Sequence, residues 1–179
     1  MVFSRRHFVK LGLATAAASV FPLPRIALAG SAARELAFYH THTGETLKAV
    51  YFDNGRYQPD ALAAFDHVLR DWRTGDVHPV DPALYDQLHA LQASVETPGA
   101  FHIICGYRSP KTNEMLHETT DGVATHSLHM DGKAIDLNLP GKDLDHLHRA
   151  ALALNAGGVG YYPASDFIHM DTGKVRRWG

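Results

Sequence analysis

The spacing of apolar residues predicts short elements along the first half of the chain. Residues 36–42 and 45–52 alternate between apolar and polar positions around Thr43-Gly44, which is typical of a hairpin. Residues 60–72 repeat apolar side chains at helical spacing, and we expect Trp72 to lie on the buried face of that helix. Asp81-Pro82 is a capping residue followed by proline at the first helical position, so a second helix begins there and ends near residue 98.

The second half of the chain is richer in predicted strands. We expect strands at 101–105, 133–139, 159–162 and 167–171, helices at 109–116 and 144–154, and a polar loop at 118–126. The last two strands flank a proline-containing turn, which predicts another hairpin. Helices gather early and strands late, so the order favours an α+β fold over a wound parallel sheet. We find no repeat and no boundary that would divide residues 30–179 into two domains.

The first 29 residues are typical of a cleaved export signal. Arg5-Arg6 stands in a twin-arginine context, an apolar run covers 11–20, and Ala27-Leu28-Ala29 offers a small-residue cleavage site. A membrane helix is the alternative, but the run is shorter than the roughly 20 residues needed to span a bilayer. We therefore expect a twin-arginine signal over 1–29, a single domain over 30–179 and a periplasmic mature protein without stable membrane insertion.

Composition argues against nucleic acid as a partner and excludes stabilisation by an internal disulfide. The formal net charge of the whole chain is −2, and the signal segment carries basic but no acidic residues, so the mature protein is more acidic still. The sequence contains no basic patch of the kind that binds nucleic acid. Cys105 is the only cysteine, so no internal disulfide can form. It stands in an apolar run, and we expect a buried, inert thiol because nothing near it in sequence lowers its pKa.

A histidine, a carboxylate seven residues later and a distant second histidine form the ligand set of an open zinc site. These residues are His129, Asp136 and His169. Three nitrogen and oxygen ligands leave a fourth position for water, and they suit zinc better than magnesium or calcium. The three can share one face of a sheet if the strand of His169 pairs with that of Asp136. The competing interpretation is chance, because the chain contains 13 histidines.

The surrounding motifs resemble a known family. Ser127-x-His129-x-x-Gly132-x-Ala134-x-Asp136 and Asp166-x-x-His169 are similar to the two motifs of the D-Ala-D-Ala carboxypeptidase, lysostaphin and hedgehog-like zinc peptidases. The segments 106–109 and 167–173, the latter Phe-Ile-His-Met-Asp-Thr-Gly, add a likeness to the murein endopeptidases of this family. The resemblance covers most of 36–179 and implies a small domain with the metal on a central antiparallel sheet and helices packed on one side.

The resemblance also implies a role for individual residues. One zinc ion per chain would be held by His129, Asp136 and His169. Asp166, three positions before the last ligand, would be the general base, although Pro-Ala-Ser-Asp is also an ordinary hairpin turn. A regular strand would place Asp166 and His169 on opposite faces, so the base role requires a bend near Ser165. Arg108 would stabilise the oxyanion, with a substrate-carboxylate clamp or a surface ion pair as alternatives.

Four further residues receive weaker assignments. We expect Asp171 to lie on the same strand face as His169 and to fix its tautomer. Ser127 and Asp131 are expected to stabilise the loop, and His126 either lines the cleft or lies on the surface.

The expected function is hydrolysis of peptide cross-links in peptidoglycan by a metal-activated water. The partners would be peptidoglycan stem peptides, and the sequence does not reveal a tethering or activating protein. The rivals are a D,D-carboxypeptidase or dipeptidase that trims stem peptides, and a non-catalytic module that binds zinc or murein. An acidic residue at Asp166 favours catalysis.

Overall fold

The N-terminal hairpin starts a single eight-stranded sheet. The computed structural model describes residues 32–97, 99–120 and 123–179, so the predicted signal at 1–29 lies outside the described residues. The strands are β1 (Arg34–His40), β2 (Thr46–Asp53), β3 (Arg56–Tyr57), β4 (Phe101–Cys105), β5 (Ala134–Asn138), β6 (Gly158–Tyr162), β7 (Phe167–Asp171) and β8 (Arg176–Trp178). Their order across the sheet is β3-β2-β1-β4-β5-β7-β6-β8. Only β1–β4 and β6–β8 pair in parallel among these strands, which confirms the mainly antiparallel α+β fold.

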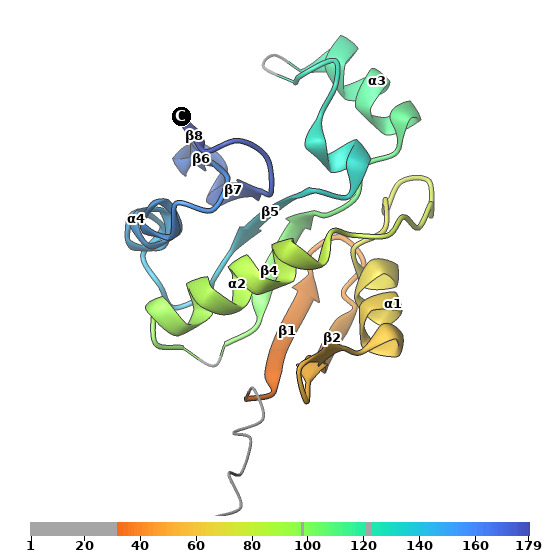
Figure 1. Ribbon diagram of the computed structural model, residues 1–179. Helices are drawn as coiled ribbons and strands as arrows, with labels where there is room; N and C mark the ends of the chain where they lie inside the picture. Colours follow the sequence, from red (N-terminus) through yellow and green to blue (C-terminus); the bar gives the residue numbers. More distant parts are fainter. Residues whose placement is uncertain (1–31, 98, 121–122) are drawn as a thin grey trace, which may run out of the picture.

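Three helices cover one face of this sheet. The helices are α1 (Pro59–Val68), α2 (Pro82–Ser94), α3 (Pro110–Thr119) and α4 (Leu144–Leu154), with short 3-10 turns η1 (Leu128–Asp131) and η2 (Pro163–Ser165). α1 and α2 pack on the β1–β2 part of the sheet and α4 on β6 and β7, while α3 lies beyond the end of β4 (Figure 1). Within the described residues, no helix has the length and apolar character needed to cross a membrane.

Strand alternation separates the core from the opposite face. Ile135 and Leu137 of β5 and Ile168 and Met170 of β7 are buried in the core beneath the helices. The intervening residues point the other way, because successive side chains of a strand alternate between faces. The polar residues of β5 and β7 therefore share the face that the helices leave free.

The predicted helix at 60–72 is too long. α1 ends at Val68, where the backbone N–H of Leu69 closes the last turn on Phe65. The buried carboxylate of Asp71 then accepts hydrogen bonds from the backbone and hydroxyl of Ser109, which draws the chain toward α3. Trp72 is consequently 36% exposed instead of buried. The predicted loop at 118–126 also begins late, because α3 continues to Thr119.

Candidate metal centre

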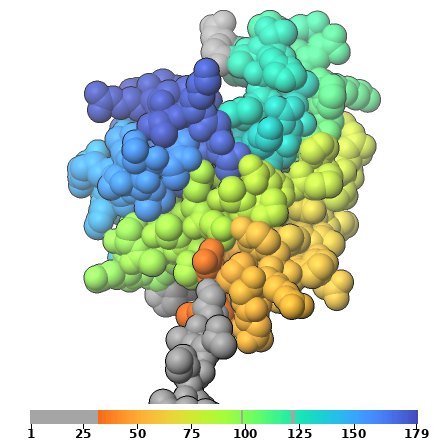
Figure 2. All heavy atoms as spheres, viewed as in Figure 1, coloured from red at the N-terminus to blue at the C-terminus, as the bar shows by residue number. Residues whose placement is uncertain are grey.

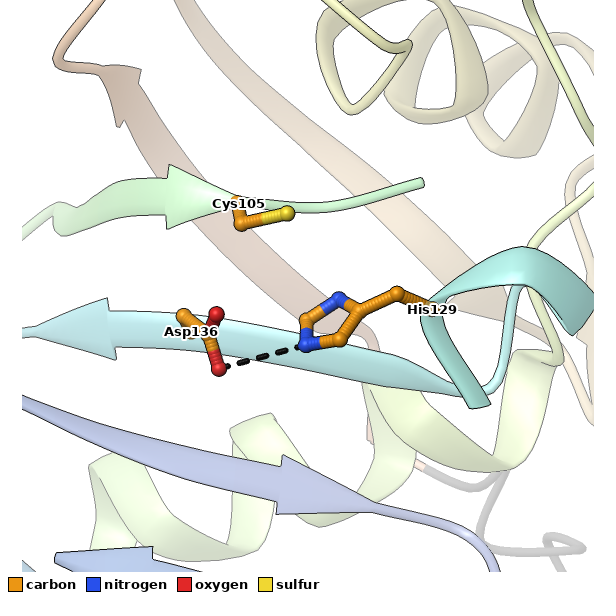
Figure 3. A group of neighbouring side chains, drawn as sticks. All are labelled: Cys105, His129 and Asp136. Carbon is orange, nitrogen blue, oxygen red and sulfur yellow. Dashed lines mark ion pairs between the residues drawn. The ribbon is translucent and has the colours of Figure 1, made fainter. Parts of the chain in front are cut away.

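Strand register brings two of the predicted ligands together. β5 and β7 pair antiparallel with Asp136 directly opposite His169. The third, His129, lies in η1, where the Ser127 side chain accepts a hydrogen bond from the His129 backbone N–H. Gly132 ends this turn with a φ of +65°, a conformation that suits glycine. Figure 3 shows His129 reaching from this turn toward Asp136 on the strand.

The three predicted ligands meet through single atoms. His129 Nε2 lies 3.2 Å from Asp136 Oδ1, and His169 Nδ1 lies 2.9 Å from the same oxygen. The two ring nitrogens are 3.2 Å apart. The three residues are 2%, 7% and 8% exposed, so bulk water hardly reaches the cluster.

Neighbouring acceptors fix the tautomer of both rings. His129 Nδ1 lies 2.7 Å from the carbonyl oxygen of Gly106, and His169 Nε2 lies 3.1 Å from Asp171 Oδ2. A carbonyl and a carboxylate only accept, so these two nitrogens must donate. In the neutral rings, the lone pairs of His129 Nε2 and His169 Nδ1 then face each other and the Asp136 oxygen. Such a convergence requires a positive charge among the three atoms.

A zinc ion fits this requirement. Tetrahedral zinc about 2.1 Å from its ligands holds the ligand atoms roughly 3.4 Å apart, close to the spacing observed here. A proton on one ring is the alternative source of positive charge. Burial lowers the pKa of His129, but Asp136 and Cys105 raise it well above its usual value. Burial raises the pKa of Asp136, but His129 and His169 together lower it by more. The net shift is downward, so the carboxylate is ionised.

Cys105 is not the isolated thiol that the sequence predicts. A bulge between Ile103 and Cys105 shifts the β4 register, so Ile103 faces the core opposite Leu137 whereas Cys105 lies opposite Asp136. Its sulfur lies within 4.8 Å of ligand atoms of His129 and Asp136 (Figure 3). Burial raises the pKa of the thiol, but His129 and Arg108 act in the opposite direction, and the net shift is downward. The expectation that nothing lowers this pKa is therefore wrong.

Arg108 lies at the edge of the same cluster. Its Nη2 atom is 3.8 Å from Asp136 Oδ2 and 3.7 Å from the Cys105 sulfur, and its Nη1 donates to Asn113 Oδ1 at 3.4 Å. Its Nε is buried and has no hydrogen-bond partner within the described residues. The guanidinium thus faces the Asp136 carboxylate and is partly buried. This distinguishes its contact with Asp136 from a simple surface ion pair.

Asp166 occupies the bend on which its predicted role depends. η2 interrupts the hairpin, and Asp166 follows it in the left-handed region with a φ of +53°. Its carboxylate accepts from Asn138 Nδ2 at 3.1 Å. Asn138 and Asp136 share a face of β5, so the side chain lies on the side of the predicted ligands. The left-handed conformation is also typical of aspartate in turns, so both interpretations of this residue stay open.

Asp171 and an arginine that the sequence did not single out support His169. The buried carboxylate of Asp171 accepts from His169 and, at 3.1 and 2.7 Å, from Nη1 and Nη2 of Arg176. Burial raises the pKa of Asp171, but these hydrogen bonds lower it more. The predicted tautomer-fixing contact of Asp171 is present. Arg176 escaped notice because β8 carries no apolar periodicity.

A cavity of about 610 Å³ opens above the predicted ligands. It lies between the segment around η1 and the C-terminal strands, which are side by side in Figures 1 and 2 (teal and dark blue). Arg108 and the ligands line it, together with Tyr162, Phe167 and Trp178. His126 also lines the cavity but is exposed, and its Nε2 atom lies 4.0 Å from Asp131 Oδ1. The ligand cluster is therefore accessible from this cavity.

Sequence comparison identifies the family of this chain. Residues 28–178 match the family described as "Peptidoglycan L,D-endopeptidase MepK". The protein of that name from Escherichia coli K12 is 41% identical over 176 residues, covering 98% of this chain and 97% of the relative. "Probable peptidoglycan L,D-endopeptidase MepK" from Haemophilus influenzae is 38% identical over 177 residues, covering 98% and 95%. The chain belongs to the MepK family of peptidoglycan L,D-endopeptidases.

Proposed function

We propose that this chain is a periplasmic zinc peptidase that hydrolyses peptide cross-links in peptidoglycan. The main support is the convergence of three donor atoms of His129, Asp136 and His169 within 3.2 Å beneath an open cavity. The names of the relatives direct the proposal to a bond between an L- and a D-configured residue. The twin-arginine motif supports a periplasmic site of action.

One zinc ion would be held by His129, Asp136 and His169. Two imidazoles and one carboxylate suit zinc, although manganese, cobalt or copper can also use such ligands. When bound, zinc would supply a water acidic enough to ionise near neutral pH and would polarise the scissile carbonyl.

The protein side chains would position the substrate and move the proton. Asp166 is exposed and accepts one side-chain hydrogen bond within the described part of the chain, and it would carry the proton from the attacking water to the leaving amine. Arg108 lines the cavity with its guanidinium beside Asp136 and would stabilise the developing oxyanion. Asp171 keeps the His169 ring in the tautomer that leaves Nδ1 free.

The contacts of Arg176 favour an endopeptidase over a carboxypeptidase. A carboxypeptidase needs a free cationic group that binds the terminal carboxylate of its substrate. Arg176 lines the cavity, but both terminal nitrogens of its guanidinium are engaged by Asp171. Arg108 is left as the candidate clamp, and it faces Asp136 directly.

The test is digestion of purified cross-linked murein by the zinc-loaded mature protein, with and without a chelator, followed by mass spectrometry of the released muropeptides. Conversion of dimers to monomers that the chelator abolishes would support the proposal and identify the bond. Loss of terminal residues from monomers alone would reassign the protein as a carboxypeptidase. No change would favour a binding module. His129→Ala should be inactive, whereas His146→Ala, an exposed position on α4, is the matched control.

A further inference from the structure

Trp178, the second residue from the C-terminus, reaches back to the ligand cluster. Gly160 of β6 pairs with His169 on one side and with Trp178 on the other. The Trp178 ring extends across Gly160, so that its centroid lies 5.1 Å from the centroid of the His169 ring. A residue of β8 thereby lines the cavity directly beside a predicted ligand.

Glycine at position 160 makes this approach possible. A Cβ atom there would lie 2.7 Å from Cε2 and from Nε1 of Trp178, closer than side-chain atoms normally come. Any other residue would push the indole away from β6. Gly160 and Trp178 thus form a matched pair, in which the missing side chain of one makes room for the ring of the other.

Two contacts hold the indole in place. Its Nε1 donates to the Tyr162 hydroxyl at 2.8 Å, and the Arg176 guanidinium lies over the ring at 4.9 Å from the centroid. Tyr162 in turn stacks on Phe167 at 4.6 Å. All four side chains line the cavity. We call Tyr162, Phe167 and Trp178 the aromatic wall. A wall fixed before binding loses little conformational entropy when a ligand packs on it.

We propose that Trp178 is a substrate-binding residue whose indole packs against the stem peptide beside the scissile bond. This inference rests on the proposed function. The distance to His169 limits the contact to the residue at the scissile bond or its neighbour, because an extended peptide advances about 3.3 Å per residue. A sugar of the glycan strand would have to replace the stem peptide at the reaction centre to contact the ring. The ligand is therefore the aliphatic part of a peptide.

The first experiment measures hydrolysis of a soluble cross-linked muropeptide dimer by zinc-loaded variants. Trp178→Ala should raise KM roughly tenfold and leave kcat within about threefold, whereas Trp178→Phe should keep most of the binding. Zinc affinity is measured in parallel and should change less than about threefold, since the indole is no ligand. Unchanged KM would overturn the proposal, and so would a loss of zinc affinity that accounts for the whole defect.

The second experiment uses the Gly160–Trp178 pair. Gly160→Ala should displace the indole and reproduce the KM increase of Trp178→Ala. In the double variant, Gly160→Ala should add nothing, because the ring that it displaces is already gone. Additive KM effects would contradict the proposal, because they would show that Gly160 acts through something other than Trp178.

A third measurement observes binding without turnover. Trp72 and Trp178 are the only tryptophans, so Trp72→Phe leaves Trp178 as the sole indole fluorophore. Titration of this zinc-loaded variant with a purified muropeptide monomer, a product that is not cleaved further, should change its emission saturably. The disaccharide without peptide should not. A response to the disaccharide alone would identify the glycan as the ligand of Trp178 and overturn the proposal.

The outcomes separate this inference from the proposed function. If the wild type fails to cleave murein, the proposed function is wrong. If the wild type cleaves murein and the Trp178 variants have an unchanged KM, only this inference is wrong.

Discussion

The Nε2 atom of His129 and the Nδ1 atom of His169 lie 3.2 Å apart, and in the neutral rings neither can donate a hydrogen bond to the other. The other nitrogen of each ring donates to an oxygen that can only accept. The pair therefore repels unless a cation lies between the rings or one ring is protonated. The same contacts that orient the two rings also create the need for a positive charge, which a metal ion or a proton would supply.

Zinc should stabilise the folded protein, and His169→Ala should abolish this effect. Metal at about 100 times its Kd adds about 2.7 kcal/mol to the free energy of unfolding. For a domain of this size, that corresponds to a rise in Tm of roughly 5–10 °C. Differential scanning fluorimetry with and without zinc measures the shift, and His146→Ala should keep it. An equal shift in His169→Ala would place the zinc elsewhere.

Asp171→Asn should weaken metal binding without emptying the site. An amide presents either its oxygen or its NH₂ group to His169, so it no longer enforces the tautomer that leaves Nδ1 free. Loss of such a supporting carboxylate typically costs 10- to 100-fold in metal affinity. Competition with a chromogenic chelator measures the change. Because Asp171 is fully buried and also accepts from Gly158 and Gly173, a separate denaturation curve is needed to record the loss of stability.

Asp166→Asn separates the two roles that this residue can have. Asparagine tolerates the left-handed backbone as well as aspartate does, so the turn should be preserved. A general base typically contributes 10²- to 10⁴-fold to the rate, and kcat should fall by about that factor while zinc affinity stays constant. The muropeptide dimer assay provides the measurement. Unchanged kcat would leave Asp166 as a turn residue and require another base.

Stability should fall as the pH drops from 6.5 toward 4 because of His40. Burial, reinforced by His42 and Arg70, lowers the pKa of this fully buried histidine to about 4. Between that value and its ordinary pKa, the unfolded chain binds a proton that the folded protein excludes, so acid favours unfolding. The expected loss between pH 7 and pH 5 is about 2 kcal/mol.

Urea unfolding of the wild type and of His40→Gln at the two pH values tests this prediction. The variant is neutral throughout, so its stability should depend less on pH, by the amount assigned to His40. His146→Gln controls for the removal of an exposed histidine and should behave like the wild type. Equal pH dependence in wild type and His40→Gln would mean that His40 is protonated in the folded protein.

The sequence alone was sufficient for most local elements and for the choice of the three candidate ligands. Apolar alternation and capping residues such as Asp81 and Ser109 act within a few residues, so they are readable without a structure. The spacing of His129, Asp136 and His169, combined with the family motifs, named the donors that the structure then brings together.

What the sequence could not provide depended on contacts between distant segments. The end of α1, and with it the exposure of Trp72, follows from a hydrogen bond between Asp71 and Ser109. The bulge in β4 decides that Cys105 faces Asp136 instead of the core. β8 has no periodic signal, and it places Arg176 and Trp178 beside His169 only through pairing with β6. Such contacts form only once the chain has folded, so local propensity does not encode them.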